Sequence, residues 1–346
     1  MQKENNNGIE TIQNNSEILF IFEAKMTNPN GDPDDENRPR MDYDRNLNLV
    51  SDVRLKRYIR DYIANNIQGD RNKIFVRKID GASVNAKKSL ANILRLKESK
   101  KIELNSDQED NFKNSAIDVR LFGAVVPDVK FANKSNATLT GAVQFNWGYS
   151  LNKFNGPIDS NGITSHFQTG KSSDTEESTK SSGAMGKDYR VGYSIIAFHG
   201  IISAKRAEQT NLSDSDIDIF DDAMVKAIPS EATTRSKMGQ TPLFYLRAEY
   251  NSPDYFIGDL RRYIKLVNKE NKEIPFEESD KLDWDKYKLD ISKLKTKFEN
   301  AKDNISAIYF WKHEDIELTG WELKEDNIVI QKVELPKEKK SEHQNG

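Results

Sequence analysis

The mixed order of its predicted strands and helices places this chain of 346 residues in the α+β class, with an antiparallel sheet and helices on one face. The regular strand–helix alternation of a doubly wound fold is absent from the predicted order. Segments 16–26, 190–204 and 242–250 are apolar and rich in β-forming residues, which is typical of buried strands. The length allows one large domain or two small ones, and we expect one packed core with long solvated insertions.

Hydrophobic periodicity and turn residues place the other elements in chain order. Residues 28–35 are all turn-forming, so the first strand ends before them. The remaining predicted elements are a helix over 50–63, a short strand over 74–78, a helix near 83–97, a short helix over 107–115, a glycine turn after 117–123, a strand over 141–151, a helix near 215–227, a polar loop over 229–240, a helix over 290–301 and a last core strand over 305–311.

Composition separates one domain, residues 16–335, from two tails that we expect to be disordered, residues 1–15 and 336–346. Residues 155–187 consist almost wholly of Gly, Ser, Thr, Asn and charged residues. A compact domain rarely carries so long a loop without a use for it, and we place a functional insertion at about 152–188. A second, highly charged insertion is predicted at about 268–303.

Several classes of protein are excluded by residue type. The chain has no cysteine, so disulfides, thiolate metal sites and cysteine nucleophiles are ruled out. This agrees with a reducing, cytoplasmic location. We expect no signal peptide in the polar N-terminal residues, and apolar runs such as 18–22 are too short to cross a bilayer, so we expect no membrane partner.

The net charge is −3, but the charges are unevenly distributed. Residues 38–78 contain eleven basic and five acidic residues, whereas acids concentrate at 214–222 and 273–285. A protein that binds RNA on one face and packs against copies of itself elsewhere can have this distribution.

The helix over 51–63 has two contrasting faces. At 100° per residue, Leu55, Tyr58, Ile59, Tyr62 and Ile63 fall within an arc of about 140°. The opposite side carries Arg54, Lys56, Arg57 and Arg60. Such a face can follow a phosphate backbone through counterion release. An ordinary solvated helix face has the same pattern, and periodicity alone leaves both interpretations open.

The turn over 28–40 is unusually dense in polar groups. Asn28 and Asn30 can offer amides to a phosphate or base, and Arg38 and Arg40 add bidentate donors. The acids in this turn lack the spacing of an EF-hand and usually just face water. A plain surface turn remains the alternative.

The sequence TGKS at 169–172 is not a phosphate-binding loop. Such a loop needs a glycine where Ser165 stands, and no apolar strand leads into it. A basic, flexible hairpin that includes Lys171 is favoured, and His166 in the same segment can touch RNA. His199 lies in an apolar strand and is interpreted as a core histidine. We expect no metal site and no cofactor.

The loop over 229–242 places Arg235 and Lys237 between a helix and a strand. A phosphate contact and a plain surface loop are both compatible with this pattern.

Several motifs in fixed order resemble one family. They are NPNGDPDDENRPRMD, VSDVRLKRYIRDY, DVRLFGAV, TGAVQFNWGYSL and GAMGKDYRVGYSIIAFHGIISAKRA, and the similarity runs from about residue 16 to about residue 250. The chain resembles the backbone subunits of type I CRISPR interference complexes (Cascade), most closely the subtype I-B group of this RAMP superfamily. The acidic, Ser/Thr-rich insertion departs from the pattern, so the residue that wedges between nucleotides is not assigned.

The resemblance implies a modified RNA-recognition-motif (ferredoxin-like) palm with finger and thumb insertions. It implies several copies along one guide RNA (crRNA), each thumb folding over the RNA in the next palm. The implied partners are crRNA, target DNA through the guide, other copies of the chain, the 5′-handle-binding, large and small subunits, the crRNA-processing endonuclease and a recruited helicase-nuclease.

The resemblance also assigns roles to residues of this chain. The insertion at about 152–188 matches the thumb, with Met185 and Lys187 near its base. The RNA-contacting residues it implies, together with those above, are Asn28, Asn30, Arg38, Arg40, Arg54, Lys56, Arg57, Arg60, Gln144, His166, Lys171, Met185, Lys187, Arg235 and Lys237.

Three functions follow as hypotheses. The first is a non-catalytic guide-RNA scaffold, whose contacts to the sugar-phosphate leave the bases available for pairing. The second is a metal-dependent ribonuclease of the type III backbone kind, with Asp32, Asp34 and Asp35 as candidates. The third is a stand-alone single-stranded-RNA module that binds as a monomer.

Overall fold

In the computed structural model, the first described residues lie inside the predicted N-terminal tail. Residues 10–15 are ordered against the core: Ile12 is buried and its N–H donates to the Leu212 carbonyl (3.1 Å). Asn15 is also buried, and its amide donates to the Pro253 carbonyl (2.8 Å). These contacts extend the fold ahead of the first strand. The described residues are 10–79, 81–97, 99, 101–132, 137–164, 185–279, 281–323 and 331–333.

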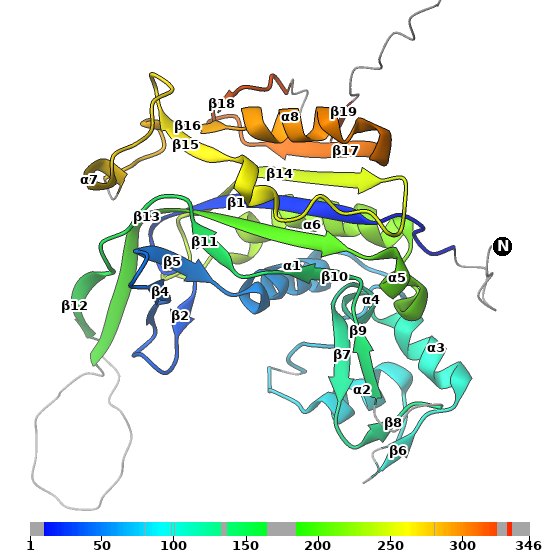
Figure 1. Cartoon of the computed structure of the whole chain (residues 1–346). Helices are drawn as coiled ribbons and strands as arrows, with labels where there is room; N and C mark the ends of the chain where they lie inside the picture. The colour runs from blue at the N-terminus through cyan, green and yellow to red at the C-terminus, as the bar shows by residue number, and fades with distance from the viewer. Residues whose placement is uncertain are drawn as a thin grey trace, which may run out of the picture.

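One large sheet runs through the molecule (Figure 1). Its strand order is β19-β17-β14-β1-β13-β11-β5-β4, and β10 and β12 pair with β13 beside this path. The described strand pairs of this sheet run antiparallel, so the predicted α+β class with an antiparallel sheet is confirmed. The strands are β1 (Ser16–Thr27), β4 (Met41–Asp42), β5 (Leu47–Val50), β10 (Val143–Phe145), β11 (Gly148–Ser150), β12 (Ile158–Thr164), β13 (Met185–Ile202), β14 (Gln240–Tyr250), β17 (Ile305–Lys312) and β19 (Gln331–Val333).

Strand β1 is buried on both faces of this sheet. Ile18, Phe20 and Phe22 pack with the helices on one face, and Leu19 and Ile21 pack on the other. Because successive side chains of a strand point to opposite faces, a strand covered on both sides is a continuous apolar run. The helices on the first face are α1 (Asp52–Asn66), α4 (Ile117–Phe122), α5 (Ala204–Thr210) and α6 (Asp214–Glu231). No helix in the described ranges has the length and apolar character needed to cross a membrane.

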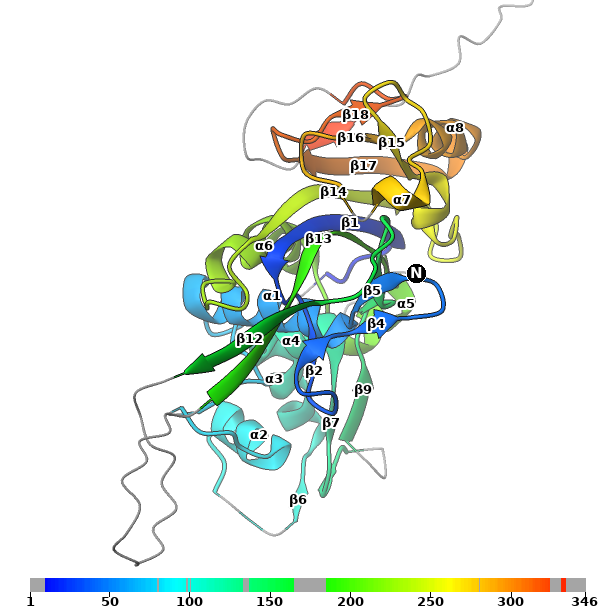
Figure 2. The same cartoon turned by 90° about the vertical axis from the view of Figure 1, so that its left-hand side faces the viewer.

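The second face of the sheet is covered by residues 255–323, so the prediction of helices on one face only is wrong. Figure 2 shows α8 and α6 on opposite sides of β1 and β14. Leu289, Leu294 and Phe298 are fully buried on this second face. The charged segment 268–303 therefore supplies core residues spaced among its charges. The elements of residues 255–323, apart from strand β17 of the large sheet, are η1 (Leu260–Tyr263), β15 (Lys265–Asn268), α7 (Phe276–Ser279), β16 (Tyr287–Asp290), α8 (Ser292–Asn300), η2 (Lys302–Asn304) and β18 (Leu318–Thr319).

A third core lies apart from the large sheet, around α2, α3 and β7 (Figures 1 and 2). Phe75 and Phe112 meet edge to face at its centre, with ring centroids 5.2 Å apart. The chain enters this unit beside a close crossing, where a Cβ on Gly123 would lie 2.2 Å from the Leu139 carbonyl oxygen. With φ of 82°, this position requires glycine. The elements are α2 (Ala86–Leu94), β6 (Ile102–Glu103), α3 (Ser106–Ser115), β7 (Gly123–Val126), β8 (Val129–Lys130) and β9 (Ala137–Thr140).

The strand predicted over 74–78 is absent from the structure. The Asp118 carboxylate accepts the N–H groups of Phe75 (2.7 Å) and Val76 (3.0 Å), which a strand would use in its ladder. A distant side chain thus replaces a neighbouring strand as hydrogen-bond partner.

The strand predicted over 141–151 is divided into β10 and β11. Between them, the Asn146 side chain accepts the N–H of Trp147 (2.8 Å), which interrupts the ladder. Gly148 then lies directly on Phe198, where a Cβ would come within 2.5 Å of the ring. The break turns Trp147 outward, and its side chain is 42% exposed.

The low-complexity segment 155–187 is described at its two ends only. β12 pairs with the first part of β13, with Ile158 opposite Arg190 and Thr164 opposite Met185. These two strands form an arm that extends beyond the rest of the sheet (Figure 1). The composition predicted a flexible insertion, whereas its ends contain strands. His166 and Lys171 lie outside the described residues.

Candidate nucleic-acid interface

The amide-rich turn after β1 holds the start of α1. Ser51 is the N-cap residue, and its Oγ accepts the N–H of Arg54 (3.3 Å). Asn30 Oδ1 accepts both the N–H and the hydroxyl of Ser51, each at 2.8 Å. Asn30 Nδ2 donates to the Gly31 carbonyl (3.2 Å). The Asn30 side chain, predicted to contact RNA, is therefore engaged in positioning the helix.

Two of the four cations predicted on the exposed face of α1 are held inside the fold. Lys56 is 8% exposed, and its Nζ donates to Asp52 (3.0 Å) and to Gln144 (3.1 Å). Arg60 Nε donates to the fully buried Asp118 (3.0 Å). The prediction of a four-cation surface is wrong for Lys56 and Arg60, because α4 and β10 cover this side of the helix. Gln144, also predicted to touch RNA, is a partner of Lys56.

Arg54 and Arg57 lie on the side of α1 that remains open. The Arg54 guanidinium lies 4.0 Å from the centre of the Tyr58 ring, and its Nε is buried without a hydrogen-bond partner among the described residues. Arg57 has a 62% exposed side chain and pairs with Asp61 one helical turn away (3.3 Å). Such surface pairs are weak, so Arg57 can exchange Asp61 for another anion.

The loop between α6 and β14, residues 232–239, packs against the same turn. It begins later than predicted because α6 continues through Pro229. The Ser236 carbonyl accepts the N–H of Asn28 (2.9 Å) and the hydroxyl of Thr27 (2.6 Å). These bonds join two segments that lie far apart in the sequence.

Lys237 reaches from this loop to the open side of α1. Its Nζ donates to the carbonyls of Asn28 and Pro29. Burial lowers the pKa of Lys237 to about 7, and the charges of Arg54 and Arg57 contribute to the same shift. We call Arg54, Arg57 and Lys237 the cationic cluster. Three basic groups from two distant segments converge there, an arrangement that favours an anion such as phosphate.

Arg235 connects the loop to the arm formed by β12 and β13. Its Nη1 lies 3.3 Å from the Asp188 carboxylate, and its side chain is 62% exposed. Arg190 binds the same carboxylate (2.9 Å) and donates to the Met26 carbonyl (2.6 Å). The base of the arm is thereby fixed beside the end of β1.

The turn predicted over 28–40 contains a small hairpin, which the sequence did not indicate. Glu36 and Asn37 adopt the left-handed conformation at its tip, with φ of 47° and 62°. Arg40 Nη1 pairs with Asp32 (2.9 Å), so one predicted RNA donor already has a carboxylate partner. The hairpin strands are β2 (Gly31–Asp32) and β3 (Arg38–Pro39).

Glu36 joins this hairpin to β13. Its carboxylate accepts from Lys187 Nζ (2.7 Å) and from the Tyr189 hydroxyl (2.8 Å). These hydrogen bonds hold the pKa of Glu36 below its ordinary value. The Arg38 guanidinium lies 4.5 Å from the centre of the Tyr189 ring. Tyr189 was missed in the sequence, although residues two apart on a strand share a face with Lys187.

The acids of the hairpin do not form a metal centre in the part of the chain that the structure describes. There, no group of three or more His, Asp or Glu side chains is placed to hold a metal ion. His199 occupies the core as interpreted: its Nδ1 accepts the N–H of Leu260 (3.4 Å), and its ring lies 3.7 Å from Glu17. Burial lowers the pKa of His199, which favours the neutral ring.

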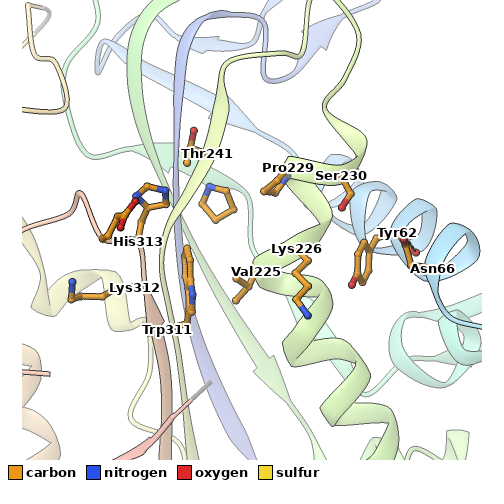
Figure 3. Close-up of a pocket in the computed structure, with 12 residues that line it drawn as sticks. Tyr62, Asn66, Val225, Lys226, Pro229, Ser230, Thr241, Trp311, Lys312 and His313 are labelled. Atoms are coloured by element: carbon orange, nitrogen blue, oxygen red, sulfur yellow. Dashed lines mark hydrogen bonds between the residues drawn. The ribbon is translucent and has the colours of Figure 1, made fainter. Parts of the chain in front are cut away.

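A separate cavity of about 790 Å³ lies between the ends of α1 and α6 and the strands β14 and β17 (Figure 3). Trp311 and Val225 line it with apolar surface, and Tyr62 and Lys226 line it from the helices. None of its lining residues belongs to the cationic cluster or to the predicted RNA contacts. The cavity is therefore distinct from the candidate interface.

The protein combines an antiparallel α+β core with a cationic cluster at the end of its central strand. This places it in the class of proteins whose surface chemistry suits the binding of phosphate groups. The family model for "CRISPR-associated protein Cas7" matches residues 14–292, a range that contains the whole cluster. The chain belongs to the CRISPR-associated Cas7 family.

One relative is the CRISPR-associated protein Cas7 of Haloferax volcanii, which is 31% identical over 312 residues, covering 86% of this chain and 87% of the relative. Among solved structures, a chain of a pre-nicking CRISPR RNA-guided surveillance complex is 15% identical, with a TM-score of 0.39 and coverage of 68% of this chain and 75% of that one. A chain of a CRISPR RNA-guided surveillance complex is also 15% identical, with a TM-score of 0.35 and coverage of 68% of each chain.

Proposed function

We propose that this chain is the non-catalytic backbone subunit of a type I CRISPR Cascade, an RNA-guided complex of antiviral defence. Several copies line up along one crRNA, hold its sugar-phosphate backbone and present its bases to target DNA. Membership of the Cas7 family carries this proposal. We further propose subtype I-B, which the motifs quoted above resemble most closely, and a cytoplasmic location.

The chemistry of the cationic cluster supports this role. A guide of arbitrary sequence must be held by groups that ignore base identity. Guanidinium and ammonium groups meet this condition because they bind phosphate regardless of the neighbouring base. Arg54, Arg57 and Lys237, with the exposed Arg235 beside them, offer such groups from several segments of the chain.

In this proposal the large sheet is the palm, of the RNA-recognition-motif type, and the third core is the finger region. The arm of β12 and β13 is the base of the thumb, which covers the RNA on the next copy. The other partners are the 5′-handle-binding, large and small subunits, the crRNA-processing endonuclease and the recruited helicase-nuclease.

Co-purification tests the proposal directly. The chain is expressed together with its natural repeat array and purified under native conditions. We expect bound crRNA and particles whose mass increases with the length of the RNA. Protein that never carries RNA would overturn the proposal, and tight binding by a monomer that never polymerises would favour the stand-alone RNA module.

We also propose that the chain does not cut RNA. In a ribonuclease of the type III backbone kind, an acid in the palm-side loop acts on the RNA, and Asp32 occupies that loop. Here the Asp32 carboxylate pairs with Arg40 at 2.9 Å. The test incubates the assembled complex with magnesium and complementary labelled RNA. We expect intact RNA, whereas periodic cuts that Asp32→Ala abolishes would identify an enzyme.

A further inference from the structure

Lys237 occupies an environment that is unfavourable for a lysine without an anion. It is half-buried, and within the described ranges its Nζ donates to main-chain carbonyls alone, those of Asn28 and Pro29. No carboxylate in the described residues stabilises its charge. A buried ammonium without a countercharge loses much of its hydration free energy and gains little in return.

The position of Lys237 is fixed by the elements around it. Its carbonyl accepts from Gln240 Nε2 (2.9 Å), and Gln240 is hydrogen-bonded to the Tyr58 hydroxyl on α1 (3.1 Å). The N–H of Lys237 donates to the Thr234 carbonyl (2.8 Å). Both main-chain groups of Lys237 are therefore held, which fixes its backbone beside α1.

The charged groups that face Lys237 are mainly positive. From α1 these are Arg54, which lies over the Tyr58 ring, and Arg57. On its own loop, Arg235 is directed toward Asp188 of β13. The turn after β1 faces it with the carbonyl oxygens of Asn28 and Pro29.

Two acids on the neighbouring elements α1 and β13 are already paired with other cations. Asp61 pairs with Arg57, and Asp188 is shared by Arg190 and Arg235. Neither compensates the ammonium of Lys237. Within the described part of the chain Lys237 thus has no anionic partner, and an anion from outside can supply one.

We propose that the cationic cluster is a seat for one RNA phosphodiester, and that Lys237 takes up a proton when the phosphate enters and releases it when the phosphate leaves. This inference rests on the proposed function, since RNA supplies the phosphate. It adds a coupling between guide binding and protons that phosphate contacts through arginine alone would not have.

The direction of the coupling follows from the charges. Without RNA, burial and the two arginines hold the pKa of Lys237 at about 7, so much of it is neutral at pH 8. A phosphate beside Nζ favours the charged form and raises this pKa. Binding therefore takes up a proton above pH 7 and none well below it. RNA affinity falls as the pH rises, by at most about tenfold per pH unit for each seat.

Calorimetry with a short uridine oligonucleotide measures the proton directly. Titrations at pH 8 in Tris and in HEPES, whose ionisation enthalpies differ, give the number of protons taken up per bound chain. We expect nearly one proton for the unmodified chain. We expect Lys237→Arg, which stays charged, to bind the oligonucleotide without this uptake. Lys205→Arg is the matched control, because Lys205 is exposed, paired with Asp254 and outside the predicted RNA contacts, and it should keep the full uptake.

A neutral variant is also needed in case the larger side chain introduced by Lys237→Arg does not fit the site. Lys237→Gln should bind more weakly than the unmodified chain at pH 6.5, by about tenfold or more, with the gap narrowing as the pH rises. Binding without proton uptake by the unmodified chain, or equal uptake by Lys237→Arg, would overturn the proton linkage and leave the scaffold role intact. Absence of any RNA binding would overturn the proposed function and the seat together.

Discussion

The two sides of helix α1 carry the same kinds of residue in opposite situations. On one side, Lys56 and Arg60 are paired with Asp52 and Asp118 beneath α4 and β10. On the other side, Arg57 is exposed and its partner is a surface carboxylate. A helical wheel cannot separate these two sides, because both lie opposite the apolar face.

The difference shows that the covering elements decide what a cation does. Asp118 comes from α4 and Gln144 from β10, and both are distant from α1 in the sequence. Their acceptors neutralise the buried side, so those cations hold the fold together. The open side faces Lys237 instead, where positive charge accumulates. Structural cations and candidate phosphate-binding cations are therefore neighbours on one helix.

The largest effect is expected when Asp118, the acid that pairs with Arg60 on the buried side of α1, is removed. Asp118→Ala takes away the acceptor for Arg60 Nε and for the N–H groups of Phe75 and Val76. Because it leaves a largely buried cation and two main-chain donors without a partner, we expect the free energy of unfolding to fall by about 3 kcal/mol or more. Chemical denaturation followed by circular dichroism measures the loss.

The matched control removes the corresponding acid on the open side. Asp61→Ala deletes the carboxylate paired with Arg57, and we expect a change of at most about 1 kcal/mol because surface pairs are weak. An equal loss in the free energy of unfolding for both variants would contradict the contrast between the two sides of α1.

The second prediction concerns RNA binding by the open side. Reversing both charges with Arg54→Glu and Arg57→Glu should weaken RNA binding by more than about tenfold and to a similar degree for every guide sequence, since only phosphate contacts are lost. The slope of log affinity against log salt concentration should decrease by about one per lost contact. Filter binding over a salt series measures both quantities.

A double variant with the same charge change elsewhere is the control for this prediction. Lys205 on α5 and Lys295 on α8 are exposed, pair with the surface acids Asp254 and Glu299, and lie away from the cationic cluster. Lys205→Glu with Lys295→Glu should alter RNA affinity far less. A loss confined to some guide sequences would point to base contacts and contradict the phosphate interpretation.

A smaller effect is expected from the buried lysine of α1. Lys56→Gln removes the cation held between Asp52 and Gln144 and should lower the free energy of unfolding by about 1 kcal/mol. The folded fraction should bind RNA with unchanged affinity, because Lys56 is only 8% exposed. Stability and affinity are measured on the same preparation, and a clear loss of affinity would place Lys56 at the RNA.

Much of this fold is predictable from local sequence. The continuous apolar run of β1 indicates burial on both faces, and the spacing of Leu55, Ile59 and Ile63 predicts α1. The charged segment 268–303 misleads because its core residues, such as Leu294 and Phe298, are diluted by lysines and acids. Covering layers built from such diluted patterns give a weak sequence signal.

The candidate site is only partly predictable, since its electrostatics depend on contacts between distant segments. The residues of the cationic cluster were selected from the sequence, but the depressed pKa of Lys237 follows from burial against α1. Asn30 illustrates the opposite case: its amide looks available in the sequence, yet it caps the start of α1 through Ser51. No sequence pattern within residues 28–40 indicates that Asn30 binds Ser51.

The smallest predicted effect is at Glu36, where the hairpin meets the base of the arm. Glu36 occupies donors of Lys187 and Tyr189 that an RNA phosphate could otherwise use. Because the pair is exposed, Glu36→Gln should leave thermal stability nearly unchanged. It should strengthen RNA binding a few-fold at low salt, since Lys187 no longer has an internal anion as partner, and the gain should fade as salt screens the charges.

Removing any acid from this hairpin also makes the surface less negative, so a charge-matched control is needed. Asp34→Asn makes the same charge change in the same hairpin, at an exposed acid whose described hydrogen bond is made by its N–H, to Asp32. If the gain came from overall charge, both variants would bind RNA equally well. A gain specific to Glu36→Gln would show that Lys187 and Tyr189 form a second anion site beside the cationic cluster, partly occupied by the chain itself.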